Sequence, residues 1–294
     1  MNRVCFLLVA GAFALTAGAK DWVLPTAVTT SGSDALTNLK WWGGTDGARP
    51  TADDHLIVGG NMRIRATGAD CPAGSFQLGT DDADGNPQYG EFVHDGVTSA
   101  SFKTLKLHCG HWWCNQQKDY SLTAERIEVT SGAAYPFAMS FGQAQYQGKT
   151  MTVSGAVHGD ENACLRLGYG KYSPSKYTVC ASTETFVFDG FATYSGTVSV
   201  LAQNPCDGDD FGVRLQLKTM ASPCALSIEK GGVLSTFTDA SGAMSTVSVA
   251  KVTFKADSRF EPVLGNEGAS QVRVTDVLAF SGLTKLPVYV NSVL

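Results

Sequence analysis

The sequence has little positive charge, no long apolar run after its first residues and scarce helical patterning. Its 22 Lys and Arg residues against 27 Asp and Glu residues give a formal net charge of −5. This balance argues against a nucleic-acid partner, because such partners select a basic face. After the N-terminal segment no apolar stretch approaches the roughly 20 residues of a membrane-spanning helix, so nothing predicts an integral membrane segment in the processed chain. Apolar residues spaced at about 3.6 are scarce, which speaks against helices.

Motifs of common catalytic sites are missing as well. The chain contains no Gly-x-Ser-x-Gly, no phosphate-binding glycine loop and no His-Glu-x-x-His. Adjacent carboxylates, which glycan-cleaving enzymes use as acid and base or nucleophile, occur at Asp160-Glu161 and Asp209-Asp210 in turn-like segments. We therefore expect no catalytic residues and a protein without enzymatic activity. A polysaccharide lyase or glycoside hydrolase on a β-helix scaffold is the alternative.

Residues 1–19 have the composition of a secretory signal peptide. Asn2-Arg3 is a short positive region, residues 4–16 are apolar, and Ala17-Gly18-Ala19 fits the small-x-small rule for cleavage before Lys20. The sequence thus predicts an exported protein of 275 residues (294 minus 19), either secreted and extracellular or held at a bacterial cell surface.

Seven cysteines follow the predicted cleavage site, and spaced cysteines in an exported protein favour disulfides. Pairing neighbours along the sequence would link Cys109 to Cys114, Cys164 to Cys180 and Cys206 to Cys224, with Cys71 left over. Spacing alone does not determine this connectivity.

Short runs of alternating apolar and polar residues fill the rest of the chain and predict an all-β fold. Runs such as 104–108 (TLKLH) and 246–255 (TVSVAKVTFK) are bounded by Gly, Asn, Asp and Ser, which mark turns. The centres of these runs recur every 22 to 26 residues, at Leu105, Ile127, Met151, Tyr177, Val200, Leu226, Val249 and Val272. This period favours a β-solenoid, in which each coil stacks on its neighbours. Spacings near 12 residues, such as Phe188 to Val200, would suit an antiparallel β-sandwich instead.

The first part of the processed chain differs from the rest. All five Trp and all five His precede residue 159, and residues 79–92 (GTDDADGNPQYGEF) have the composition of a loop. A solenoid also needs a cover on its first coil, because an open coil end is an unpaired sheet edge. We interpret residues 20–100 as an N-terminal cap and residues 101–294 as solenoid coils.

A family resemblance points to the same architecture. Within residues 34–60, a turn with Trp41-Trp42 precedes Pro50, the pair Asp53-Asp54 and an apolar strand over residues 56–58. This arrangement is similar to the opening of large bacterial exported proteins with autotransporter-type β-strand repeats. The segments 187–200 and 249–264 likewise look like their glycine-punctuated repeat units. The resemblance implies a right-handed parallel β-helix passenger, often with an adhesive role.

Residues 108–114 (HCGHWWC) gather two His, two Cys and two Trp. A zinc site would use Cys109 and Cys114 with His108 or His111, but no second close pair of ligands completes the usual pattern. Strand alternation also turns His108 away from Cys109. We therefore favour a turn closed by a Cys109–Cys114 disulfide over a zinc site.

The adjacent tryptophans offer a second interpretation of the same region. Two neighbouring residues of a strand point to opposite faces, so one indole of each pair is expected to face solvent or a loop. An exposed indole can stack on the apolar face of a sugar ring while its N–H donates a hydrogen bond. The candidate glycan-binding residues are Trp41, Trp42, Trp112, Trp113 and His111. The alternative, which we favour, is that these tryptophans cover the end of the hydrophobic core.

One acidic turn has the spacing of a calcium loop. Asp82, Asp84 and Asn86 present alternate oxygen ligands around Gly85, but Phe92 or Val93 stands where an EF-hand loop has its Glu. A solvated turn is the alternative, because Asp and Asn favour turns. Calcium is thus the one cofactor for which the sequence contains a candidate site, and we expect no other. Taken together, the patterns predict an exported β-solenoid with a structural or adhesive role and an extracellular glycan or cell-surface partner.

Overall fold

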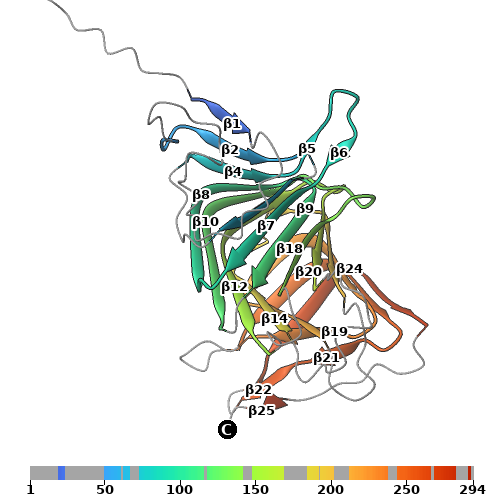
Figure 1. The fold of residues 1–294 in the computed structure, drawn as a ribbon. Coiled ribbons are helices and arrows are strands. Elements are labelled where there is room, and N and C mark those ends of the chain that lie inside the picture. Colours follow the sequence, from blue (N-terminus) through green and yellow to red (C-terminus); the bar gives the residue numbers. More distant parts are fainter. Residues whose placement is uncertain are drawn as a thin grey trace, which may run out of the picture.

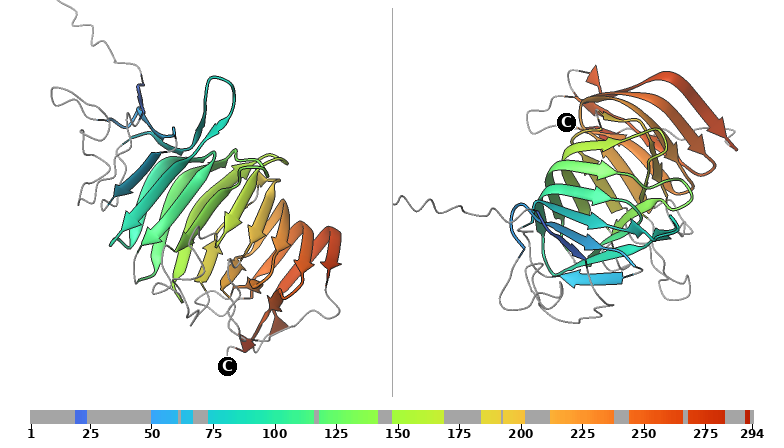
Figure 2. Two further views of the ribbon diagram at one scale, coloured as in Figure 1. Left: turned by 45° about the vertical axis from the view of Figure 1, so that its right-hand side comes forward. Right: turned by 90° about the horizontal axis from the view of Figure 1, so that it is seen from above.

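The protein is a β-solenoid built from two stacked parallel sheets (Figures 1 and 2). The computed structural model describes residues 19–23, 50–60, 62–66, 73–115, 118–141, 148–168, 184–191, 193–201, 212–237, 244–265, 268–282 and 291–292. These residues form strands and turns without a helix. The predicted all-β solenoid is therefore confirmed.

The first sheet, here called sheet A, runs along one side of the solenoid. In spatial order it contains β1 (Asp21–Val23), β2 (His55–Val58), β4 (Ser75–Leu78), β8 (Ser99–Leu107), β10 (Tyr120–Val129), β12 (Thr150–Gly159), β14 (Glu184–Phe188), β17 (Val213–Leu217), β19 (Gly232–Thr236) and β21 (Arg259–Glu261). The short strand β15 (Thr193–Tyr194) pairs with the end of β12. Every one of these pairings is parallel.

The second sheet, sheet B, takes the alternate strands of the chain. It contains β3 (Met62–Ala66), β7 (Gly90–Asp95), β9 (Gly110–Asn115), β11 (Phe137–Phe141), β13 (Cys164–Leu167), β16 (Thr197–Val200), β18 (Met220–Ile228), β20 (Thr246–Lys255) and β24 (Gln271–Ser281). Its pairings are also all parallel. Because the chain passes from sheet A to sheet B and back, each coil contributes strands to both, and the antiparallel sandwich is ruled out.

Two small antiparallel elements project from the coils. The segment predicted as a loop forms a hairpin of β5 (Thr80–Asp81) and β6 (Pro87–Gln88), which stands out near the N-terminal end in Figure 1. At the other end, β22 (Val263–Gly265) pairs antiparallel with β23 (Gly268–Ala269) and parallel with β25 (Asn291–Ser292).

The hydrophobic core lies between the two sheets and consists of ladders of equivalent residues. In sheet A, Phe76 pairs in register with Leu105, and Leu105 with Ile127. In sheet B, Phe92 pairs with Trp112 and Trp112 with Met139. All of these side chains are buried. Each contributes about 1.5–3 kcal/mol of hydrophobic free energy, so the stacked ladders hold successive coils in one register.

The sheets extend through the predicted N-terminal cap. Within residues 20–100, the strands β2, β3, β4 and β7 belong to the same two sheets as the later coils. The views in Figure 2 show these strands stacked on the green coils that follow. The solenoid therefore has strands on both sides of the predicted boundary at residue 100.

Candidate functional site

The candidate site lies on the outer face of sheet B, where one ladder of residues crosses five neighbouring strands. Arg63 of β3 pairs with Glu91 of β7, Glu91 with His111 of β9, His111 with Ala138 of β11, and Ala138 with Arg166 of β13. Their chain neighbours on the inner face are core residues, so alternation directs this ladder outward. Long charged or polar side chains thus flank the small side chain of Ala138.

The small side chain of Ala138 leaves a cavity of about 270 Å³ between His111 and Arg166. The cavity is lined by Tyr89, Glu91, Gly110, His111, Ala134, Pro136, Ala138 and Arg166. The lining combines apolar surface from Pro136 and the alanines with a carboxylate, an imidazole and a guanidinium. Polar groups that converge beside apolar walls are one feature of ligand sites.

The imidazole of His111 is held from two sides. Its Nε2 lies 2.7 Å from Oγ of Ser140 on the next strand. Its ring packs edge-on against Trp113, with 4.6 Å between the ring centroids. Because His111 is also buried, the protein itself fixes its orientation.

Glu91 is fixed in a similar way by Arg63. The Nε of Arg63 donates a hydrogen bond to Oε2 of Glu91 at 2.5 Å, and the side chain of Glu91 is largely shielded from solvent. The guanidinium of Arg63 lies 5.5 Å above the Trp113 ring. Trp113 therefore supports both His111 and the ion pair from beneath.

The two indoles of β9 point in opposite directions, yet neither offers an open face. Trp112 lies in the core, with its ring centroid 4.4 Å from that of Phe92. Trp113 points to the outer face but is only 4 % exposed. The expectation that one of them faces solvent is wrong. Trp112 lies within the core between β7 and β11, and so it does not cover the end of the core as the favoured alternative expects. Trp41 and Trp42 lie outside the described residues.

The predicted Cys109–Cys114 disulfide is wrong, because both residues are free thiols. Gly110–Asn115 forms the extended strand β9 in place of a turn. Five residues at about 3.3 Å each place the two Cα atoms roughly 16 Å apart, whereas a disulfide needs them within about 7 Å. The thiol of Cys109 donates to the carbonyl of Gln88 at 3.1 Å, and Cys114 is buried in the core.

Two further cysteines with predicted disulfides, Cys164 and Cys224, are also free thiols in the structure. Their proposed partners Cys180 and Cys206 lie outside the described residues, as does Cys71. Burial raises the pKa of the Cys109 thiol to about 11, and it raises the pKa values of the other free thiols as well. These thiols stay protonated and are therefore poor nucleophiles.

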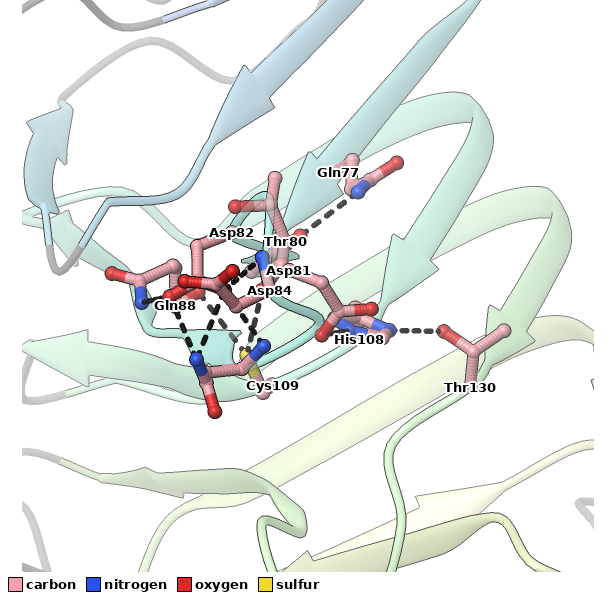
Figure 3. Close-up of polar contacts among 11 residues, drawn as sticks. Gln77, Thr80, Asp81, Asp82, Asp84, Gln88, His108, Cys109 and Thr130 are labelled. Atoms are coloured by element: carbon pink, nitrogen blue, oxygen red, sulfur yellow. Dashed lines mark hydrogen bonds and ion pairs between the residues drawn. The ribbon is translucent and has the colours of Figure 1, made fainter.

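His108 faces away from the cysteines and joins two neighbouring coils (Figure 3). Its Nε2 lies 2.9 Å from Oδ1 of Asp81, and its Nδ1 lies 2.9 Å from Oγ1 of Thr130. Across the described parts of the chain, no group of three or more His, Cys, Asp or Glu side chains is placed to hold a metal ion. The zinc interpretation therefore has no structural support.

The acidic turn between β5 and β6 is organised by its own N–H groups (Figure 3). Oδ1 of Asp82 accepts hydrogen bonds from the backbone N–H groups of Asp84 and Asn86 at 3.0 and 2.8 Å. The side-chain amides of Asn86 and Gln88 donate to the same carboxylate. The backbone hydrogen bond from Asn86 is the main cause that lowers the pKa of Asp82. The carboxylate thus stabilises the hairpin by itself, and calcium binding by Asp82, Asp84 and Asn86 stays a prediction.

Of the two carboxylate pairs, the structure describes Asp160-Glu161, which forms part of a turn away from the cavity lining. Oδ1 of Asp160 accepts hydrogen bonds from the backbone N–H groups of Asn162 and Ala163, at 2.9 and 3.1 Å, and so closes a turn. Asp209 and Asp210 lie outside the described residues. Asp160 and Glu161 do not line the cavity.

Sequence reasoning singled out His111 but missed Tyr89, Glu91 and Arg166. Together with His111 these residues come from three different coils, and the in-register steps from Glu91 through His111 and Ala138 to Arg166 are 20, 27 and 28 residues. Because the coils differ in length, the sequence could have shown that these residues are neighbours only if the coils had first been aligned with one another.

Comparisons with protein families, curated proteins and solved structures find no match for this chain. Among the described residues there is no helix of the length and apolarity required to cross a membrane.

Proposed function

We propose that this protein is an exported β-solenoid, secreted or at the cell surface, that has an adhesive role and binds glycans without cleaving them. The observation that carries the proposal is the cavity on the outer face of sheet B. Its size, about 270 Å³, is just below the range of about 300–1,000 Å³ that is usual for ligand sites. It suits one ring of a glycan better than a large ligand.

The chemistry of the lining supports a sugar ring. Tyr89 is 38 % exposed, and together with Pro136 it offers an apolar surface on which the apolar face of a sugar can pack. Glu91 and His111 supply hydrogen-bonding groups for hydroxyls. Because Arg63, Trp113 and Ser140 already hold these two side chains, binding costs little additional ordering.

The absence of a second carboxylate in the described cavity lining favours binding over cleavage. Glycosidases of the usual kind need two carboxyl groups about 5–9.5 Å apart. The cavity presents Glu91 alone, and that carboxylate is engaged with Arg63. The export signal and the resemblance to autotransporter-type passengers support an extracellular adhesive role.

The test is a glycan array probed with the processed chain and two single-site variants. Tyr89→Ala removes the exposed wall of the cavity, and we expect it to abolish or strongly weaken binding without a change in the melting temperature. Tyr135→Ala is the matched control, because Tyr135, in the turn between β10 and β11, is a 46 % exposed tyrosine that does not line the cavity. Binding that survives Tyr89→Ala would contradict the assignment of the site. Release of shortened or unsaturated glycans would contradict the non-enzymatic role.

A further inference from the structure

We infer that Asp54 is the binding site for the new N-terminus that signal-peptide removal creates. The freed α-ammonium group of Lys20 forms an ion pair with the Asp54 carboxylate and so fastens β1 to sheet A. This inference rests on the export signal in the proposed function, and it is independent of the glycan-binding cavity.

Cleavage changes the charge on the backbone nitrogen of Lys20. In the structure this nitrogen belongs to the amide that joins Ala19 to Lys20, and it is neutral. A signal peptidase hydrolyses this amide with one water molecule: the C–N bond breaks, Ala19 keeps a carboxylate, and Lys20 gains an α-ammonium group. An α-amino group is mostly protonated at neutral pH. The processed chain therefore begins with a positive charge at this position.

The Asp54 carboxylate already lies at this nitrogen. The backbone N–H of Lys20 donates a hydrogen bond to Oδ1 of Asp54 at 2.8 Å. The other oxygen, Oδ2, accepts hydrogen bonds from the backbone N–H and the hydroxyl of Thr51 at 2.7 and 3.0 Å. Asp54 is only 7 % exposed. The new charge thus meets an oriented carboxylate that is largely shielded from water, where salt screens an ion pair less than at the open surface.

The Asp54 carboxylate has no side-chain counter-ion. No ion pair among the described residues includes Asp54. The Nζ of Lys20 lies over the Trp22 ring, 3.9 Å from the ring centroid. Burial alone would raise the pKa of Asp54, but hydrogen bonds from the backbone N–H groups of Thr51 and Lys20 outweigh burial and lower it. Asp54 is therefore an ionised, shielded carboxylate, and such a group favours a cationic partner.

The ion pair acts on a short strand at the edge of a sheet. β1 has three residues and is the last strand of sheet A at its N-terminal end. It is held by Trp22, which packs in the core, and by the carbonyl of Lys20, which accepts a hydrogen bond from the backbone N–H of His55 at 2.9 Å. Short terminal segments open readily. A charge-assisted contact at the first residue of β1 keeps this strand on β2, whose edge is otherwise open to pairing with other chains.

Hydrogen exchange of the His55 amide measures the opening of β1. Two forms of the processed chain are compared after release from a fusion tag: one begins at Lys20, and the other carries Gly-Ser before Lys20. The second form moves the charge two residues away but keeps the neutral hydrogen bond to Asp54. Because hydrogen bonds to charged groups are the stronger ones, we expect the form that begins at Lys20 to exchange roughly fivefold to tenfold more slowly.

Variants locate the effect on Asp54. Asp54→Asn is expected to make the two forms exchange at equal rates, because asparagine accepts the hydrogen bond but carries no charge. Asp53→Asn is the matched control, because Asp53 is the neighbouring carboxylate in the chain and is exposed. In this control the difference between the two forms is expected to persist. Circular dichroism verifies that each variant is folded, and the comparison of the two forms with Asp54 intact needs no substitution.

The outcomes separate this inference from the proposed function. Equal exchange of the two forms with Asp54 intact, or a difference that persists in Asp54→Asn, would overturn the ion pair and leave export and glycan binding standing. Mass spectrometry of the exported protein should find Lys20 as its first residue, and another first residue would overturn the cleavage on which the inference rests. Failure of the glycan array would overturn the assignment of the cavity and leave the ion pair standing.

Discussion

Replacement of Gly155 by alanine is the sharpest perturbation of the coil stacking. Gly155 lies in β12 at a register shift, where β10 places Ala124 and Glu125 between the pairs that flank it. Its φ is +130°, and a Cβ at this position would lie 1.9 Å from the carbonyl oxygen of Ala124 in the neighbouring coil. The obstacle is backbone and cannot rotate away, so one of the two strands has to move.

The magnitude follows from two contributions. Holding a side chain at this φ costs roughly 1–2 kcal/mol, and forcing a backbone shift in a packed structure costs roughly 1–3 kcal/mol more. We expect Gly155→Ala to lower the free energy of unfolding by about 2–5 kcal/mol, a large part of the 5–15 kcal/mol of typical proteins.

Urea denaturation followed by circular dichroism measures this loss as a lower midpoint. Gly132→Ala is the matched control, because Gly132 has no heavy atom within 4 Å of the added Cβ. The control is expected to stay within about 0.5 kcal/mol of the native chain. If Gly155→Ala were equally neutral, the register between β10 and β12, and with it the stacking of these coils, would be refuted.

Three further predictions concern the core. Burial raises the pKa of Glu184 from 4.5 to about 8, so the folded chain retains a proton that the unfolded chain releases. As the pH rises from 4.5 to about 8, the free energy of unfolding should fall by up to about 1.4 kcal/mol per pH unit. The urea midpoint should depend less on pH in Glu184→Gln, and an unchanged pH dependence in this variant would contradict the burial of Glu184. Trp112→Ala is expected to lower stability by about 3–5 kcal/mol yet leave sugar affinity of the folded protein unchanged, and calorimetry showing lost affinity would contradict its place in the core. Non-reducing peptide mapping should find Cys109 and Cys114 unlinked, and a linked peptide would contradict the extended β9.

The coil architecture could be predicted from the sequence because alternation and period are local signals. The predicted step from Leu105 to Ile127 is an actual in-register pair. The next predicted step, to Met151, is wrong in register, because Ile127 pairs with Val157. The turns and loops between strands vary in length without disturbing the ladders. A constant repeat length assumed from the sequence therefore identifies the fold but does not give the correct residue pairs between successive coils.

The site was less predictable because it depends on contacts between coils. Alternation predicted that the two indoles of β9 point to opposite faces, as observed, but it could not show that Trp113 is buried on the outer face beneath His111 and Arg63. The spacing of Cys109 and Cys114 suggested a closed turn, because sequence alone did not show that β9 runs extended between them. Arg166 carried no local signal at all, and its relation to His111 appears only once β9, β11 and β13 are aligned.

The measurement that tests the central claim most directly is chemical-shift mapping of the ¹⁵N-labelled processed chain during titration with a glycan that the array retains. We predict saturable shifts confined to the amides around the cavity, on β7, β9, β11 and β13, with the largest near Glu91 and His111. Shifts centred on sheet A, or shifts that do not saturate, would contradict a glycan site on the outer face of sheet B.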